Sequence, residues 1–195
     1  GSWFTEGGYV DSLISYTPME YETTRYVDLT SEKLKGQFDG SETSAYLEVG
    51  RNWFLSNDLL VQPMTSFQYS YLSLDDYTES GGVSALSFDE HCYQSYKGSL
   101  GMKAKKQFLN ETKDQNLTFE LRGRWIHEFG DTKSNINTNF ASNPGAIFKI
   151  SDKGLPRDSA ILGIGLKQIK KQNMMYYLDY DISLNREDTS NIISA

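Results

Sequence analysis

The stretch Leu117–Asp131 alternates regularly between apolar and charged side chains. The apolar parity holds Leu117, Phe119, Leu121, Trp125 and Phe129, and the opposite parity holds Thr118, Glu120, Arg122, Arg124 and Glu128. Because successive side chains of a β-strand point to opposite faces, this pattern predicts a strand with one apolar face and one charged face. A helix would scatter these charges around its circumference, so the strand interpretation is favoured.

The same period-two pattern recurs along the chain and predicts a series of strands. In addition to the stretch above, these strands cover residues 43–55, 59–73, 86–108, 158–169 and 174–184, and 191–195 begins one more. Residues 7–28 are rich in aromatic and β-branched types but give no clean assignment of faces. Polar turns are expected at 56–58, 110–116, 170–173 and 185–190, with loops or irregular segments at 29–42, 74–84 and 131–153.

About eight strands joined alternately by short turns and longer loops predict an up-and-down antiparallel meander. The strands follow one another without intervening helical periods, which excludes the parallel α/β classes. We therefore expect an all-β fold, an antiparallel barrel of which this chain forms eight or more strands. Pro63 has no backbone donor and predicts a bulge or a local break, and Arg51 interrupts the apolar side of its strand.

The alternation alone allows two arrangements of the barrel. A soluble, lipocalin-like barrel would bury the apolar side chains inside, whereas a membrane-spanning barrel turns them outward to lipid. The charge density of the polar face and the tyrosines of the apolar face favour the membrane-spanning barrel. Its water-filled interior would be lined by Lys97, Lys103, Glu120, Arg122, Arg124, Glu128, Asp179 and Asp181. Lipid would be faced by Leu117, Phe119, Leu121, Trp125, Tyr176, Leu178 and Tyr180.

The bulk composition narrows the class of protein further. A length of 195 residues suits one domain, and a formal net charge of -7 argues against nucleic acid as a partner. Mean hydropathy is -0.54, and no run approaches the ~18–20 apolar residues of a membrane helix. This does not exclude a membrane-spanning barrel, because only every second residue of a barrel strand is apolar. Cys92 is the single cysteine, so no intrachain disulfide can form, and no metal or cofactor site is expected.

Short motifs along the chain carry a resemblance to a known family. In order they are GGYVDSLISY with TTR (7–25), YLEVGRNWFL with LLVQPMTSFQYSYL (46–72), Tyr77-Thr-Glu79-Ser-Gly81, Ser95-Tyr-Lys-Gly-Ser-Leu-Gly101-Met-Lys, Arg124-Trp-Ile-His127-Glu128-Phe, and Arg157-Asp158 before a Gly-x-Gly strand. This order, over nearly the whole chain, resembles the C-terminal translocator barrel of autotransporters, the type V secretion family of Gram-negative bacteria.

The resemblance implies an outer-membrane barrel that anchors the protein and assists export of an N-terminal passenger domain. It also implies the partners: the protein's own passenger or plug helix, outer-membrane lipid and the barrel-assembly machinery. No catalytic residue is expected in the barrel. Residues 1–195 are expected to form a single barrel domain, a fragment without the family's final strand and preceding plug helix. Arg51 departs from the family pattern, which favours tyrosine, and an arginine facing lipid costs ~2–4 kcal/mol at mid-bilayer and less near the edge.

The two histidines, His91 and His127, leave one further alternative. Asp131 follows His127 by four residues, which is similar to the His–Asp arrangement of outer-membrane proteases. A barrel hydrolase is therefore a third interpretation of the sequence. His127 lies on the same face of the strand as the apolar side chains, which favours an interfacial or packed role instead. Cys92, on the same kind of parity, is expected to be buried or lipid-facing, and the acidic loop around Glu79 is expected to be solvated.

Overall fold

The computed structural model describes residues 1–110, 115–133, 135–151, 154, 156–170, 174–185 and 189–194. The regular elements of these residues are β-strands arranged in two antiparallel sheets. The predicted all-β antiparallel class is confirmed. None of the described residues belongs to a helix that could traverse a bilayer.

The larger sheet contains ten strands that follow one another as a meander. They are β1 (Ser2–Thr5), β2 (Gly8–Val27), β3 (Glu32–Arg51), β4 (Trp53–Ser56), β5 (Leu59–Leu74), β8 (His91–Asn110), β9 (Gln115–Glu128), β12 (Asp158–Lys170), β13 (Met174–Asn185) and β14 (Thr189–Ser194). Strands that neighbour each other in this order pair antiparallel, except that β4 continues the line of β3 and pairs with β5. The predicted up-and-down arrangement is therefore confirmed.

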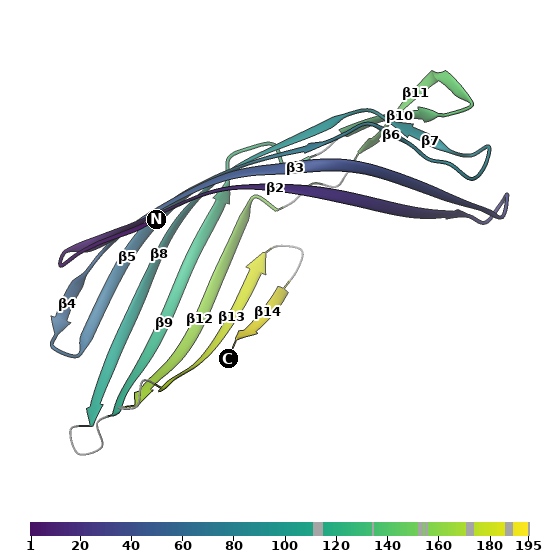
Figure 1. Cartoon of the computed structure of the whole chain (residues 1–195). Helices are drawn as coiled ribbons and strands as arrows, with labels where there is room; N and C mark the ends of the chain where they lie inside the picture. The colour runs from purple at the N-terminus through teal and green to yellow at the C-terminus, as the bar shows by residue number, and fades with distance from the viewer. Residues whose placement is uncertain are drawn as a thin grey trace.

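The sheet is strongly curled and remains open between its edge strands β1 and β14 (Figure 1). It forms part of the wall of a cylinder rather than a closed barrel. The hairpin of β2 and β3 projects far beyond the other strands (Figure 1). The pairing explains this projection, because β5 pairs with β3 only over Gly40–Gly50 while β2 accompanies β3 along its full length.

A smaller, four-stranded sheet lies beside the projecting hairpin (Figure 1). Its strands are β6 (Tyr77–Thr78), β7 (Leu86–Phe88), β10 (Asn135–Phe140) and β11 (Asn143–Ser151), in the order β11-β10-β7-β6. They come from the two long connections that leave β5 and β9 at the same end of the wall. We call this end the loop end. A bridge between Lys35 and Ser80 ties the small sheet to β3, and Leu34, Ala85, Leu86 and Thr138 form its buried core.

Two segments expected to be loops or irregular are strands instead. Most of 29–42 belongs to β3, and 131–153 contains β10 and β11. The projecting part of the hairpin is polar on its outer face, with Glu20 paired to Asp39, so it lacks the alternation that identifies the other strands. The expected single strand 86–108 is two strands, β7 and β8, which belong to different sheets.

The turn expected at 56–58 is confirmed, because only Asn57 and Asp58 separate β4 from β5. The Asp58 carbonyl oxygen accepts a hydrogen bond from the Gln107 amide at 2.8 Å, which fixes the turn against β8. The other expected turns fall largely on residues 111–114, 171–173 and 186–188, which lie outside the described residues.

Pro63 lies where β5 changes its pairing partner from β3 to β4. Of the two features expected at Pro63, the bulge is absent, because β5 runs through Pro63 without a register shift against β8, and the local break is present. The break lies on the other side, where β3 ends at Arg51 and β4 begins at Trp53. Because proline donates no ladder hydrogen bond, the pairing lapses there, and the Gln62 side-chain amide instead donates to Asn52 Oδ1 at 2.6 Å.

Candidate functional site

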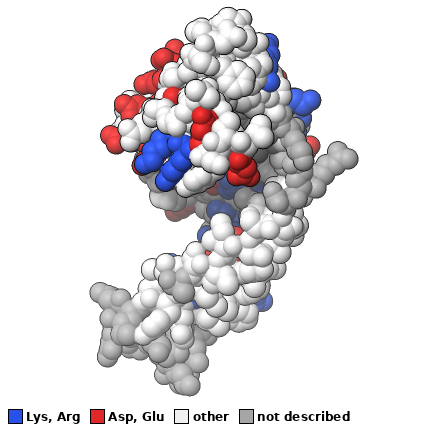
Figure 2. Space-filling view, turned by 90° about the vertical axis from the view of Figure 1, so that its right-hand side faces the viewer, with Lys and Arg blue, Asp and Glu red and all other residues white. Residues whose placement is uncertain are grey.

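The curled sheet has the opposite polarity to that of a soluble barrel. On its convex face Leu121, Trp125 and Leu178 are 47%, 47% and 50% exposed. On its concave face the carboxylate residue Glu48 is 5% exposed and Ser99 is 6% exposed. Figure 2 shows charged side chains gathered over the loop end, whereas the visible described surface of the wall below is mostly uncharged.

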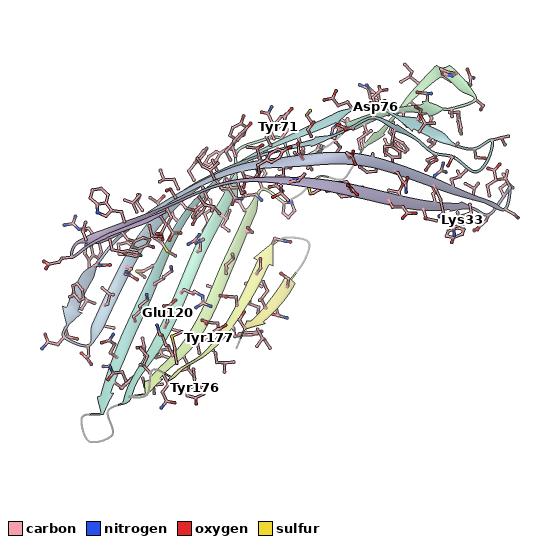
Figure 3. The ribbon with its side chains drawn as sticks, viewed as in Figure 1. Lys33, Tyr71, Asp76, Glu120, Tyr176 and Tyr177 are labelled. Atoms are coloured by element: carbon pink, nitrogen blue, oxygen red, sulfur yellow. The ribbon has the colours of Figure 1, made fainter. Side chains whose placement is uncertain are left out.

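The residues expected to line the interior share the concave face. Cross-strand pairs of the register are Lys97–Glu128 and Lys103–Arg122 between β8 and β9, and Gly163–Arg122 and Gly163–Asp181 across β12. Arg124, Glu120 and Asp179 lie two residues further along β9 and β13 and therefore share this face. Glu120, Asp179 and Tyr177 line one cavity of about 440 Å³, and Figure 3 labels Glu120 and Tyr177 on the wall.

Arg122 is the centre of the first charged cluster on this face. Its Nε and Nη2 donate to the two carboxylate oxygens of Asp181 at 2.8 and 2.7 Å, a bidentate pair. Its Nη1 donates to Asp179 at 2.8 Å and to Glu120 at 3.3 Å. Lys105 completes the cluster by an ion pair with Glu120 at 3.4 Å. Bidentate arginine–carboxylate pairs fix geometry as well as charge, so this cluster ties β9 firmly to β13.

Arg122 reaches β13 by crossing β12 where that strand has no side chain. Gly163 and Gly165 lie between the paired residues in the register. A Cβ at Gly163 would collide with Asp181 Oδ1 and lie 2.5 Å from Arg122 Nε, and one at Gly165 would lie 2.6 Å from Asp179 Oδ1. The Gly-x-Gly motif therefore provides the passage for an arginine that bonds two strands away.

Arg124 forms a second cluster on the other side of β9. Its Nη2 donates to Glu48 Oε2 at 2.5 Å, and its Nη1 donates to the Tyr46 hydroxyl at 3.2 Å. The hydroxyls of Tyr9 and Tyr46 donate to the same Glu48 carboxylate at 2.7 and 2.5 Å. The buried carboxylate thus has a cation and two hydroxyls as partners, which offsets the cost of its burial.

The Arg124–Glu48 pair depends on the curl of the sheet. β8 and β5 lie between β9 and β3, so the pair spans three inter-strand spacings, about 14 Å measured along a flat sheet. The two side chains can meet only because the sheet curls, so that the straight line between them across the concave face is shorter than the path along the sheet. Gly50 lies under the Tyr9 ring, with no room for a Cβ, and lets Tyr9 reach Glu48. Together the Arg122 and Arg124 clusters link β2, β3, β8, β9 and β13.

Three other residues expected in the interior have more local roles. Glu128 is buried at the end of β9, where its carboxylate accepts hydrogen bonds from the Ser95 hydroxyl at 2.5 Å and from the backbone amides of Tyr96 and Gly130 at 2.8 Å each. It therefore caps the last rungs of the β8–β9 ladder. Lys97 is exposed beside it, and Lys103 is half-buried opposite Arg122.

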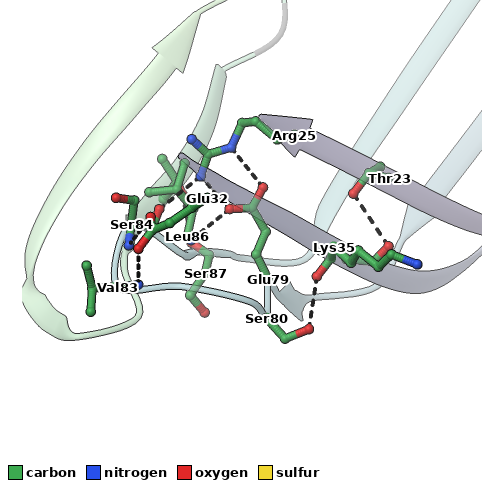
Figure 4. Close-up of polar contacts among 12 residues, drawn as sticks. Thr23, Arg25, Glu32, Lys35, Glu79, Ser80, Val83, Ser84, Leu86 and Ser87 are labelled. Atoms are coloured by element: carbon green, nitrogen blue, oxygen red, sulfur yellow. Dashed lines mark hydrogen bonds and ion pairs between the residues drawn. The ribbon is translucent and has the colours of Figure 1, made fainter. Parts of the chain in front are cut away.

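A third charged cluster holds the loop end together (Figure 4). Arg25 of β2 binds Glu79 through Nε at 3.0 Å and Nη2 at 2.5 Å, and its Nη2 also donates to the Ser84 carbonyl oxygen at 3.0 Å. The Leu86 amide donates to Glu79 at 2.9 Å. Glu32 at the start of β3 accepts from the amides of Val83 and Ser84 at 2.8 and 3.2 Å. The acidic loop residue Glu79 is therefore buried and paired, and the expectation of a solvated loop is wrong for it.

The protonation of Glu79 is set by these contacts. Burial by itself raises the pKa of the carboxyl, but the hydrogen bonds from Arg25 and Leu86 and the charge of Arg25 outweigh it. The net effect is a pKa below the ordinary value of 4.5. Glu79 is thus a carboxylate that binds the connection between β6 and β7 to the hairpin of β2 and β3.

Sequence reasoning missed the partners in this cluster, although three motif residues meet there. Tyr77 stacks between Phe38 and Phe88 at ring-centroid distances of 4.3 and 4.7 Å. Gly81 has φ of 116°, a conformation that side chains rarely adopt, and packs directly on the Lys33 carbonyl oxygen. The Tyr-x-Glu-x-Gly motif therefore serves one purpose, the docking of the loop onto the hairpin.

The residues expected to face lipid lie together on the convex face. The register of β9, β12 and β13 places Leu121 beside Ile164 and Tyr180, and Phe119 beside Leu166 and Leu178. Phe119 is half-buried among its neighbours, whereas Leu117, Leu121, Trp125, Tyr176, Leu178 and Tyr180 are 36–50% exposed. Along β8 the distance from Tyr96 to Phe108 is about 40 Å of strand, which at a usual tilt of ~40° covers the ~30 Å of a hydrocarbon core.

The edge of this apolar surface is marked on β2 and β3. The exposed Ile14 and Leu47 give way toward the loop end to Glu20, and then to Glu22, which pairs with Lys35 at 3.5 Å. Arg51 is the last residue of β3 and is exposed, and the exposed side chains of Trp53 and Leu55 follow it on β4.

His127 packs against the rings of Trp125 and Phe129, as expected, but its carboxylate partner is not the one that the sequence suggested. The carboxylate partner of His127 is Asp158 on β12, with Nδ1 at 2.9 Å from Oδ1, rather than Asp131. Trp125 Nε1 donates to the same Asp158 oxygen at 3.0 Å, so the Trp-x-His and Arg-Asp motifs meet at the loop-end edge of the convex face. Of the two positions expected for Cys92, burial is wrong, because the side chain is exposed; it lies on the same face of β8 as Leu100, and facing lipid stays a prediction. Its sulfur accepts a hydrogen bond from the Tyr71 hydroxyl at 3.0 Å.

A curled antiparallel meander with paired charges inside and exposed apolar and aromatic side chains outside is the wall of a membrane-spanning β-barrel. Comparison with known families agrees. Residues 1–181 match the family described as Autotransporter beta-domain, and the chain belongs to that family. It is accordingly an outer-membrane translocator domain of the Gram-negative type, and the predicted location in the outer membrane is confirmed.

The chain is also similar in sequence to proteins from Serratia marcescens and Pseudomonas putida. Two proteins named extracellular serine protease from Serratia marcescens are each 25% identical over 182 and 181 residues, which is 90% of this chain. A Pseudomonas putida protein named uncharacterized protein in trpE-trpG intergenic region is 26% identical over 151 residues, 76% of this chain. The chain spans 17% of the length of the Serratia relatives and 24% of the Pseudomonas relative.

Proposed function

We propose that this domain anchors a protein in the outer membrane and assists the export of that protein's own passenger domain to the cell surface. The observation that carries the proposal is the inverted polarity of the wall, in which Glu48, Arg122 and Arg124 are held inside and the large apolar side chains lie outside. A polar, hydrated interior offers an extended polypeptide no apolar wall to adhere to.

The roles of individual residues follow from this arrangement. The eight polar residues expected in the interior would line the passage or hold a plug helix by ion pairs, and the seven apolar residues expected outside would contact lipid. The barrel-assembly machinery would insert the domain. Protease activity is part of the name of the Serratia relatives, and we place any such activity in a passenger rather than in this region.

The two alternatives are not favoured. A lipocalin-like binder would bury Leu121 and Trp125 in a dry centre, but both are exposed on the convex face. A hydrolase built on His127 would need its acids around an accessible pocket, yet His127 and Asp158 lie on the apolar convex face, away from the Arg122 and Arg124 clusters.

A bulky side chain placed on each face of β8 tests the proposal. In the full-length protein expressed in a Gram-negative host, Ser99→Trp should block the concave face, whereas Leu100→Trp adds volume to the convex face. Passenger at the cell surface is measured by its accessibility to added protease, and insertion of the barrel by its heat-dependent migration on gels. We expect inserted barrel for both variants and loss of surface passenger for Ser99→Trp only. Equal export by both inserted variants would refute the proposal.

If Ser99→Trp fails to insert, the smaller change Ser99→Gln is compared with Leu100→Met. Ser99 hydrogen-bonds the Ser66 hydroxyl at 2.6 Å, and glutamine keeps a polar group there. The Ser99→Gln variant should export less passenger than the wild type, and so should Ser66→Lys, which adds a positive charge to the same face. Export by both variants that matches the wild type at equal insertion would count against a passage along this face.

A further inference from the structure

A polar crevice opens at the loop end where β9 stops pairing with β8. The last pair of the ladder is Lys97–Glu128, but β8 extends on to His91. Between this overhanging part of β8 and the chain that follows β9 lies a cavity of about 440 Å³. Its lining includes Cys92, Gln94, Tyr96, Phe129, Lys133 and Asn135.

The crevice lies at the level where the apolar convex surface ends. Tyr96 and Phe129 lie on the convex face toward the loop end, and the Tyr96 ring packs against the Tyr69 ring at a centroid distance of 5.1 Å. Aromatic side chains in this position mark the boundary between hydrocarbon and headgroups. A cavity immediately beyond them therefore faces the headgroups of the outer leaflet.

The lining combines three kinds of chemistry. The rings of Tyr96 and Phe129 give an apolar platform of the kind on which sugar rings stack, and the amides of Gln94 and Asn135 can bond hydroxyl groups. Lys133 provides a cation, and its side chain rests against Gly154, where a Cβ would lie 3.0 Å from Lys133 Cγ.

A second cation borders the crevice just before β12. Arg157 Nη1 is anchored by the carbonyl oxygens of Glu128 and Gly130 at 3.3 and 3.2 Å, and Gly130 is itself part of the lining. This anchorage uses one nitrogen of the guanidinium, and arginine presents five N–H donors in a planar fork that suits phosphate oxygens. The described lining residues include one lysine, Lys133, and one acidic residue, Asp131, while Arg157 at the border adds a positive charge near the carboxylates of Glu128 and Asp158.

We propose that this crevice binds the phosphorylated saccharide headgroup of an outer-leaflet glycolipid. The rings hold the sugar, the amides bind its hydroxyls, and Lys133 and Arg157 bind its phosphate. The proposal rests on the membrane placement of the barrel and not on passenger export, so either can fail without the other.

The test uses the wild-type, full-length protein and its native thiol. Cys92 lines the crevice and is exposed, so an occupant should slow its modification by a water-soluble maleimide. Vesicles of phosphatidylethanolamine are prepared with lipopolysaccharide, with phosphatidylglycerol, or with neither lipid but with inorganic phosphate in the buffer. We expect slower labelling, about tenfold if one charge-assisted contact worth ~1.4 kcal/mol is involved, with lipopolysaccharide alone.

Each other outcome overturns the proposal. Equal protection by phosphatidylglycerol would show generic attraction to anionic lipid, and protection by phosphate would show a free-phosphate site. Equal labelling in all preparations would show an empty crevice. Lys133→Gln should remove the protection, whereas Lys149→Gln on the exposed strand β11 of the neighbouring connection should keep it. Protection that survives Lys133→Gln and Arg157→Gln together would also refute the assignment.

Discussion

Replacing Gly163 by alanine should break the bond between β9 and β13 without adding or removing a charge. The new Cβ would collide with Asp181 Oδ1 and lie 2.5 Å from Arg122 Nε and 2.8 Å from Arg122 Cγ. Both side chains must then move, and the bidentate pair at 2.8 and 2.7 Å is lost. Gly123→Ala is the matched control, because a Cβ there meets only Leu162 Cδ2 at an ordinary 3.6 Å.

The magnitude follows from the bonds that are lost. Hydrogen bonds to charged groups contribute about 1.5–3 kcal/mol each. The side chains of Arg122 and Asp181 are 19% and 30% exposed, so water recovers part of this energy. We expect Gly163→Ala to lower the free energy of unfolding by about 2–3 kcal/mol, and Gly123→Ala to leave it unchanged or slightly higher.

The assay is urea unfolding of the full-length protein in lipid vesicles, followed by tryptophan fluorescence. A double-mutant cycle with Arg122→Met isolates the pair, since in that background the alanine at Gly163 has no guanidinium to displace. If Gly163→Ala is as harmless as Gly123→Ala, or if its cost is undiminished in the Arg122→Met background, the crossing of β12 by Arg122 does not stabilise the wall.

Three further outcomes are expected. Glu48→Gln should lower the free energy of unfolding by about 2–3 kcal/mol because it leaves Arg124 without its charged partner. The temperature at which the folded band disappears on gels should fall for this variant and stay unchanged for the control Glu20→Gln on the exposed hairpin. The Glu79 carboxylate has a lowered pKa, so its stabilisation of the loop end is complete above about pH 4.5 and fades as the pH falls through the folded-state pKa. The protection factor of the Leu86 amide, the factor by which its hydrogen exchange is slower than in an unstructured peptide at the same pH, should therefore fall on acidification in the wild type, and in Glu79→Gln it should be low without this pH dependence. With Trp3 and Trp53 replaced by phenylalanine, the fluorescence of Trp125 should be quenched by lipids brominated on their acyl chains, and an unquenched signal would contradict a lipid-facing convex surface.

The parts of the fold within the apolar belt could be predicted, because each strand there separates two environments. Strand 117–129 shows this clearly, with charged residues at one parity and apolar residues at the other. The projecting half of the β2–β3 hairpin has water on its outer face, so its polar sequence is typical of a loop, and only pairing over its full length makes it strand. β10 and β11 were missed for the same reason.

The partners within the site were beyond the reach of the alternation pattern. Parity assigns Arg122 and Arg124 to one face but does not say that they bind in opposite directions, one to β13 and the other to β3. The crossing glycine Gly163 is a local signal that could have indicated the first direction. The second depends on the curl of the sheet, which no short window of sequence records. Sequence distance pairs His127 with the nearby acid Asp131, whereas β-pairing brings it to Asp158.

The pairing of charges around Arg122 has a consequence for what such a passage can carry, because Arg122 and Lys105 with Glu120, Asp179 and Asp181 leave a net charge of only -1. Because each of these ions already has an oppositely charged partner, the surface has only a weak electrostatic potential. A polypeptide that slides along it would therefore meet neither strong binding positions nor high barriers, whatever its own sequence. Transit would then be indifferent to cargo, and one conduit could serve proteins of unlike composition.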